Sequence, residues 1–190
     1  MTNAALDTVS TVAAPGRSSW DIDPAHTDVG FAVKHLMIST VRGRFGSVRG
    51  RIVLDEADPA GSSVEVEIDA ASIDTRQEQR DAHLRSADFF DVEAFPLITF
   101  RSRSVAPAGD GRFRITGDLT MHGVSREVVL DATDAGRGID PWGNQKAAFS
   151  AETKIDRRDF GLGWNQALET GGVLVANEIR ITLDVQAVRA

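Results

Sequence analysis

The chain has four histidines, the side chains that most often serve acid–base chemistry and metal binding near neutral pH. They are dispersed along the sequence: His26, His35, His83 and His122. No two of them stand at the i, i+2 or i, i+4 spacing of a metal-binding pair, and cysteine is absent. His83 with Asp81 or Asp88 could assemble a site only through the fold. The sequence therefore predicts no metal and no cofactor.

Common enzyme signatures are also missing from the sequence. It contains no Gly-x-Ser-x-Gly elbow, no Gly-x-x-x-x-Gly-Lys phosphate loop, no His-Glu-x-x-His and no Gly-x-Gly-x-x-Gly. Tyrosine, a common proton donor, is absent. We predict that the protein is not an enzyme; the rival hypothesis is an enzyme for a hydrophobic substrate with His83 or His35 as acid–base.

Several basic side chains stand where they could donate hydrogen bonds to the polar head of a ligand. His35 precedes the apolar run 36–38 (LMI), Arg42 flanks Gly43, and His83 lies beside an aromatic-rich segment. The alternative is that the arginine is solvated and the histidines are satisfied by protein partners. His122, in a Met-His-Gly turn, is predicted to be structural.

Period-two alternation of apolar and polar residues dominates the chain from Trp20 onwards and is typical of antiparallel sheets with one wet face. Turn residues divide it into strands expected near 19–22, 27–34, 43–55, 63–71, 96–105, 111–121, 125–133, 145–156 and 176–188, with reversals at 57–61, 107–111, 122–123 and 135–138. Residues 76–86 read as a short helix capped by Asp74 or Thr75, and 157–172 as a helical turn or ordered loop. This order predicts an all-β fold, an extended antiparallel up-and-down barrel of about eight strands, with a two-sheet sandwich as the alternative.

The inward-facing rows mix small and large apolar residues. Gly117, Ala147 and Ala151 lie in register with Phe113 and Phe149. A barrel of about eight strands either fills its interior with side chains or holds one small ligand, and both interiors use such rows. The segment 88–96 (DFFDVEAFP) could cover the mouth of a cavity or plug a hydrophobic layer under a loop.

Composition and charge bound the partners. A net charge of −7 and a pI near 5.1 argue against nucleic acid or anionic membrane surfaces as main partners. Residues 2–19 lack a basic start and an unbroken apolar run, and no stretch reaches the length of a membrane span. We therefore expect a cytoplasmic protein without stable membrane insertion, with a flexible N-terminal tail at 1–18 and a barrel domain at 19–190.

Four motifs stand out in order along the chain: residues 20–27 (WDIDPAHT) leading into 29–45 (VGFAVKHLMISTVRGRF), 80–96 (RDAHLRSADFFDVEAFP) followed by 98–100 (ITF), 117–124 (GDLTMHGV) and 156–162 (DRRDFGL). Together they resemble the YceI-like family of polyisoprenoid-binding proteins. The resemblance runs in order from Trp20 to about Val185. It implies a lipocalin-like barrel around a long apolar tunnel that holds a polyisoprenoid. Many members are periplasmic and carry a cleaved signal, a pattern that residues 2–19 do not match.

The resemblance implies that this chain binds, and transports or stores, a lipophilic isoprenoid such as a polyprenyl phosphate or an isoprenoid quinone. Tail burial would supply most of the affinity, at roughly 0.8 kcal/mol per CH₂. A third hypothesis is an interaction protein with a solid core that forms a homodimer. The residues predicted to contact the ligand are Phe31, Val33, His35, Arg42, Phe45, His83, Phe89, Phe90, Phe95, Phe100, Phe113, Leu119, Phe149 and Trp164.

Overall fold

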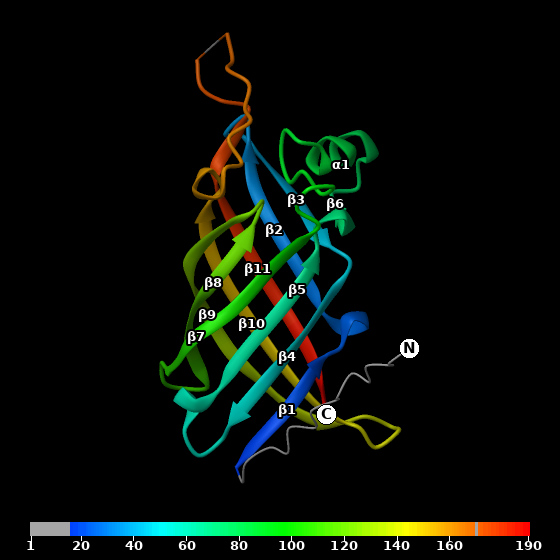
Figure 1. The fold of residues 1–190 in the computed structure, drawn as a ribbon, viewed down its shortest axis with the longest axis vertical. Coiled ribbons are helices and arrows are strands. Elements are labelled where there is room, and N and C mark those ends of the chain that lie inside the picture. Colours follow the sequence, from blue (N-terminus) through cyan, green and yellow to red (C-terminus); the bar gives the residue numbers. More distant parts are fainter. Residues whose placement is uncertain (1–15, 170) are drawn as a thin grey trace, which may run out of the picture.

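The computed structural model describes residues 16–169 and 171–190 as one twisted barrel of antiparallel strands (Figure 1). The strands are β1 Arg17–Ile22, β2 Asp28–His35, β3 Ser39–Phe45, β4 Val48–Asp55, β5 Ser63–Asp69, β6 Ile73–Asp74, β7 Leu97–Pro107, β8 Arg112–Met121, β9 Val124–Ile139, β10 Gln145–Asp156 and β11 Val175–Arg189. The helices are α1 Glu78–Arg85 and four short 3-10 helices: η1 Pro24–His26, η2 Pro59–Gly61, η3 Ala70–Ser72 and η4 Arg157–Phe160.

The eleven strands make eight barrel positions because three positions are occupied by a bent strand in two parts. β1 and β2 both pair with β11. β1 pairs with the last three residues of β11, 187–189, and β2 pairs with the part of β11 between Val175 and Asp184. β3 and β4 share the second divided position, since β3 pairs with β2 and β4 pairs with β1. β5 and β6 share the third, since β5 pairs with β4 and β6 pairs with β3. The pairing of β1 with β11 closes the sheet, which confirms the predicted eight-stranded antiparallel barrel.

The two ends of the barrel differ. One end, which we call the α1 end, carries the β2–β3 turn, α1, the His122–Gly123 turn and the described residues of the loop 157–174 (top in Figure 1). The opposite end carries the hairpin loops 56–62, 108–111 and 140–144 and the start of β1. No helix in the described part of the chain is long and apolar enough to span a membrane.

Three local expectations need correction. The reversal expected at 135–138 is instead part of β9, where Gly136 takes a left-handed φ of 113° opposite a register shift at Ala148/Phe149; the turn follows at 140–144. The side chain of Gln77, not Asp74 or Thr75, caps α1 by accepting from the backbone N–H of Arg80. The strand expected at 43–55 is broken near Gly46 into β3 and β4.

The tail predicted at 1–18 falls almost entirely outside the described residues, which begin at residue 16. β1 starts at Arg17 and pairs with β4 from that residue, two positions before the expected boundary at 19.

Candidate functional site

The barrel interior is hollow. The inward row of β11, formed by Ile179, Ile181, Leu183 and Val185, is only half-buried although the barrel surrounds it. Apolar side chains in a filled core would be fully buried. The space they border is a cavity of about 540 Å³, within the roughly 300–1,000 Å³ of sites that enclose small molecules.

This cavity extends along the barrel. Leu84, Phe89 and Val175 line it at the α1 end, while Leu54 and Phe113 line it towards the opposite end. Between these ends the wall is almost entirely aliphatic and aromatic. An elongated apolar molecule could therefore be buried along the whole length of the cavity.

Nine of the predicted ligand contacts line the cavity: Phe31, Val33, Phe45, Phe89, Phe90, Phe100, Phe113, Leu119 and Phe149. They come from β2, β3, the segment after α1, β7, β8 and β10. Small residues face the same space: Ala132 on β9 is the register partner of Ala151 on β10, and both line the cavity. Because an alanine side chain ends at Cβ, these two positions project little into the lumen.

Two of the lining phenylalanines lie over glycines in the barrel wall. A Cβ on Gly43 would stand 2.3 Å from Cζ of Phe31, its register partner across β2 and β3. A Cβ on Gly117 would stand 2.5 Å from Cζ of Phe100. Because no side chain competes for that volume, both rings can lie against the wall and leave the lumen open.

Aromatic side chains cover the α1 end. The ring of Trp164, from the loop 157–174, lies 4.7 Å from His83 of α1 and 5.2 Å from Phe89. The ring of Phe90 meets that of Phe45 edge-on at 5.8 Å. We call Trp164, His83 and Phe89 the aromatic cover; within it, only Phe89 reaches the cavity wall.

Five predicted contacts lie outside the cavity wall: His35, Arg42, His83, Phe95 and Trp164. Arg42 is exposed on β3 because the alternate residues Val41 and Gly43 take the other face, and His35 ends β2 beyond the wall. Phe95 packs instead over Gly123 and against the His122 ring at 5.0 Å.

His83 belongs to the aromatic cover, and its Nε2 lies 2.8 Å from Asp88 Oδ2. Asp81 is occupied elsewhere, since it accepts hydrogen bonds from the backbone and hydroxyl of Thr75. Within residues 16–169 and 171–190, no cluster of three or more His, Asp or Glu side chains could hold a metal ion.

One lining residue that the prediction omitted is Arg157, which begins η4 and is only 4% exposed. Its guanidinium donates to the carbonyl oxygens of Leu162 at 2.6 Å, Trp164 at 2.8 Å and Ala176 at 3.0 Å. No carboxylate in the described part of the chain forms an ion pair with it. Burial therefore lowers the pKa of Arg157, with Asp156 opposing this in part. The sequence feature that could have identified Arg157 is its position directly after an expected strand, within the segment DRRDFGL.

The opposite end has paired charges. Arg137 donates to both carboxylate oxygens of Asp134, at 2.7 and 2.9 Å, and its guanidinium lies 5.2 Å from the Phe149 ring centre and 5.5 Å from that of Trp20. Both Arg137 and Asp134 line the cavity, so an ion pair and a buried tryptophan stand at this end.

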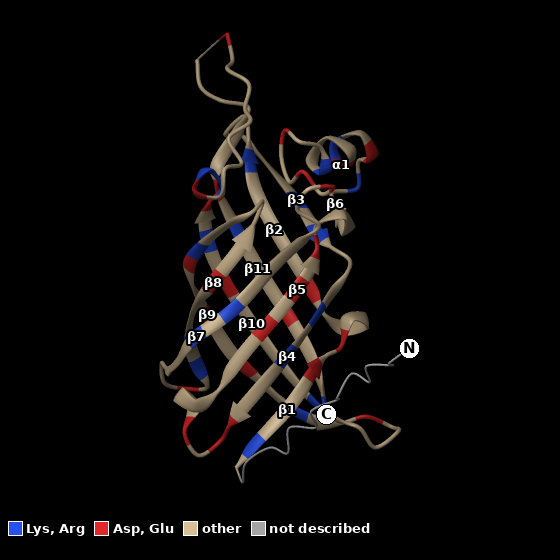
Figure 2. Ribbon diagram, in the orientation of Figure 1, with Lys and Arg blue, Asp and Glu red and all other residues tan. Residues whose placement is uncertain are grey.

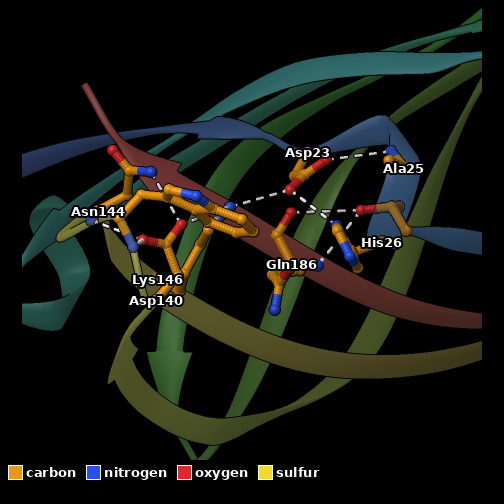
Figure 3. Close-up of polar contacts among 9 residues, drawn as sticks. Asp23, Ala25, His26, Asp140, Asn144, Lys146 and Gln186 are labelled. Atoms are coloured by element: carbon orange, nitrogen blue, oxygen red, sulfur yellow. Dashed lines mark hydrogen bonds and ion pairs between the residues drawn. The ribbon is translucent and has the colours of Figure 1, made fainter.

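A polar cluster joins the 140–144 hairpin to η1 on the outer side of the same end (Figure 3). Lys146 Nζ lies 3.0 Å from Asp23 and 3.9 Å from Asp140. Although burial acts to raise the pKa of Asp23, hydrogen bonds from Lys146, His26 and the Ala25 backbone outweigh it and lower that pKa. Hydrogen bonds from Asn144 lower the pKa of Asp140. These interactions hold the hairpin in place and leave the cavity wall untouched.

A closed, hollow, apolar barrel without a cluster of polar groups at its centre defines the class of lipocalin-like ligand-binding barrels. The comparisons with known proteins agree with that class. The chain matches the family model of the YceI-like domain over residues 20–187. It is 44% identical to the protein YceI of Escherichia coli O157:H7 over 142 residues, which cover 75% of this chain and 74% of that protein.

Solved structures share the fold. BcnA of Burkholderia cenocepacia superposes with a TM-score of 0.77 at 28% identity, covering 87% of this chain and 98% of that one. A polyisoprenoid binding domain from Saccharophagus degradans superposes with a TM-score of 0.67 at 14% identity, covering 91% of this chain and 99% of that one; it supports the fold alone. The chain belongs to the YceI-like family.

Proposed function

We propose that this protein binds a long lipophilic isoprenoid in its barrel and carries or stores it. The observation that carries the proposal is the apolar cavity of about 540 Å³ inside the barrel, against which the inward row of β11 is only partly buried. Each buried CH₂ of a guest would contribute roughly 0.8 kcal/mol, so a few isoprene units supply about 10 kcal/mol before the cost of association. The chain matches the YceI-like family model over residues 20–187, and the Saccharophagus degradans neighbour that shares this fold is named a polyisoprenoid binding domain.

The proposed head group is anionic or strongly polar and lies at the α1 end. Arg157 is a buried cation without an ion-pair partner in the described part of the chain, so a nearby anion would be favourable. Arg137, at the opposite end, is already neutralised by Asp134. This asymmetry favours a polyprenyl phosphate over a neutral isoprenoid quinone, with the tail directed towards Phe113.

The proposed role is binding and not catalysis. Neither His35 nor His83 lines the cavity, so neither could reach a substrate inside it in this conformation. Among the titratable side chains of the wall, Asp55 and the Asp134–Arg137 pair lie near one mouth and form ion pairs, as in Arg17–Asp55 at 2.9 Å.

The test is organic extraction of the protein purified from its native host, followed by mass spectrometry. We expect a stoichiometric isoprenoid, and its mass names the head group. A protein that yields no lipid, and that also gives no heat on titration with geranylgeranyl phosphate, would refute the proposal.

A further inference from the structure

The β2–β3 turn at the α1 end presents apolar side chains to solvent. Leu36 is 37% exposed, Met37 65% and Ile38 83%. We call these three residues the apolar tip. Exposed large apolar side chains that lie together at a projecting turn are unfavourable in water unless they meet a partner.

The backbone of this tip is also unfavourable for its residues. Leu36 and Met37 have φ of 53° and 59°, and the Ile38 N–H donates to the His35 carbonyl, which makes a type I′ turn. Such turns favour Asn-Gly because a side chain at positive φ meets the backbone. Two large apolar residues at these positions cost stability, and a contact made outside the folded chain would account for them.

The outer face just behind the tip is basic. Arg42 on β3, Ala32 on β2 and Arg180 on β11 are successive register partners, so the two arginines stand in one row across the sheet. Lys154 on β10 faces Arg180 in the same row, and like charges directly opposite each other destabilise a sheet. Lys154 pairs with Glu178, whereas Lys34, Arg42 and Arg180 form no ion pair within residues 16–169 and 171–190.

Acidic groups are sparse near the tip. Asp28, at the far end of β2, is the only acidic residue of the β2–β3 hairpin, whose Lys and Arg side chains are Lys34, Arg42 and Arg44. Arg44 pairs with Asp74, which leaves Lys34 and Arg42 as the cations closest to the tip. The neighbouring loop 165–174, which is joined to the tip by a hydrogen bond from Leu36 N to Leu174 O, is almost free of charge apart from Glu169 (Figure 2).

From these observations we propose that the apolar tip docks the α1 end onto an anionic lipid bilayer, where the lipophilic ligand is exchanged. The inference rests on the proposed function, because a membrane is where such a ligand resides. The spacing along the strands is compatible with this docking. At about 3.3 Å per residue, Lys34 and Arg42 lie at most about 10–13 Å behind the tip. If the apolar side chains enter the membrane interface by about 5–10 Å, the two cations lie close to the level of the lipid head groups.

A lipid surface accounts for the tip better than a protein partner does. A stable protein interface buries about 800 Å² on each partner, which three side chains of a projecting turn cannot supply. A bilayer needs only a few inserted side chains together with attraction between cations and anionic head groups. Because the net charge is −7, an anionic surface repels most of the molecule, so only the end that carries Lys34 and Arg42 can approach it closely.

The test is flotation of the ligand-free protein with phosphatidylcholine vesicles that contain about one-third phosphatidylglycerol, compared with pure phosphatidylcholine, at about 0.1 M and 0.5 M salt. The tip variant is Leu36→Asn with Met37→Gly and Ile38→Thr. The charge variant is Lys34→Gln with Arg42→Gln. The matched control is Ile139→Thr with Trp142→Ser, which removes side chains that are 74% and 84% exposed at the opposite end.

We expect the unaltered protein to float with the anionic vesicles at low salt, and the tip and charge variants to bind about tenfold more weakly. The tip variant should keep or raise its thermal midpoint, because Asn-Gly suits the turn. The control should bind like the unaltered protein.

The proposal is overturned if the unaltered protein does not bind anionic vesicles, if the tip variant binds them as strongly as the unaltered protein, or if the control variant loses as much binding as the tip variant. A tip-dependent dimer in light scattering without flotation would also overturn it. Titration with geranylgeranyl phosphate in vesicle-free solution reports separately on the proposed function, and the tip variant should leave it unchanged.

Discussion

Filling the lumen at Ala151 should weaken ligand binding while sparing the fold. Ala151 lies on β10, lines the cavity and faces Ala132 across the pair with β9. A phenylalanine there adds about six carbon atoms to a space that is already empty. In a filled core the same change would force side chains apart and cost about 1–3 kcal/mol or more.

The expected loss of affinity follows from the volume that the new ring occupies. About six ligand carbons lose their place, and at roughly 0.8 kcal/mol each the loss has an upper bound of about 5 kcal/mol. A flexible tail can shift to avoid part of this, so we expect a loss of about 2–4 kcal/mol, or roughly 30- to 1,000-fold in Kd. The stability of the ligand-free protein should stay equal or rise, since the ring buries itself against existing apolar walls.

The assay is calorimetric titration with geranylgeranyl phosphate, combined with urea unfolding of the ligand-free protein. Glu152→Phe provides the matched control, because Glu152 is the next residue on β10 and is exposed on the outer face. The reasoning is refuted if Ala151→Phe destabilises the fold by more than about 2 kcal/mol while affinity is unchanged, because that result describes a solid core.

Three further predictions concern single side chains. Lys146→Met should lower the thermal midpoint at pH 7 by about 2–4 °C because it removes the ion pair with Asp23. Since the pKa of Asp23 is lowered in the folded protein, the stabilisation by this pair is present above pH 3.8 and is lost as the pH falls further, so the difference in midpoint between variant and unaltered protein should shrink in acid. A difference in midpoint that stays the same in acid would contradict this. Arg157→Met should lower the free energy of unfolding in urea by about 3 kcal/mol because it leaves buried carbonyl oxygens without donors, and Arg157→Lys should lower it less. Only the lysine variant should keep a preference for geranylgeranyl phosphate over geranylgeraniol. If the methionine and lysine variants show the same preference, Arg157 does not bind the head group. His83→Ala should change ligand affinity less than about threefold in the same titration, because His83 lies outside the cavity wall; a loss above about 30-fold would mean that the aromatic cover itself grips the ligand.

Local chemistry specified much of this protein. Alternation of apolar and polar residues predicted the strands and their inward faces, because successive side chains of a strand point to opposite sides whatever surrounds them. The good helix formers of residues 78–85 and the turn residues at 57–61, 107–111 and 122–123 also acted locally, and they appear at the expected places. Nine of the residues predicted from these rows and from the family resemblance line the cavity.

Other features depend on distances between parts of the chain that are remote in sequence. Period two tells which face a residue takes, but whether opposite walls meet depends on barrel diameter, so the row containing Ala151 could have belonged to a solid core. Arg42 is exposed because of strand register, and Arg157 is buried because a loop closes over it. The sequence by itself determined which residues form the barrel and which way they point. Only the tertiary structure decided that the barrel is hollow and which of its cations reaches the hollow, because both depend on closure of the sheet.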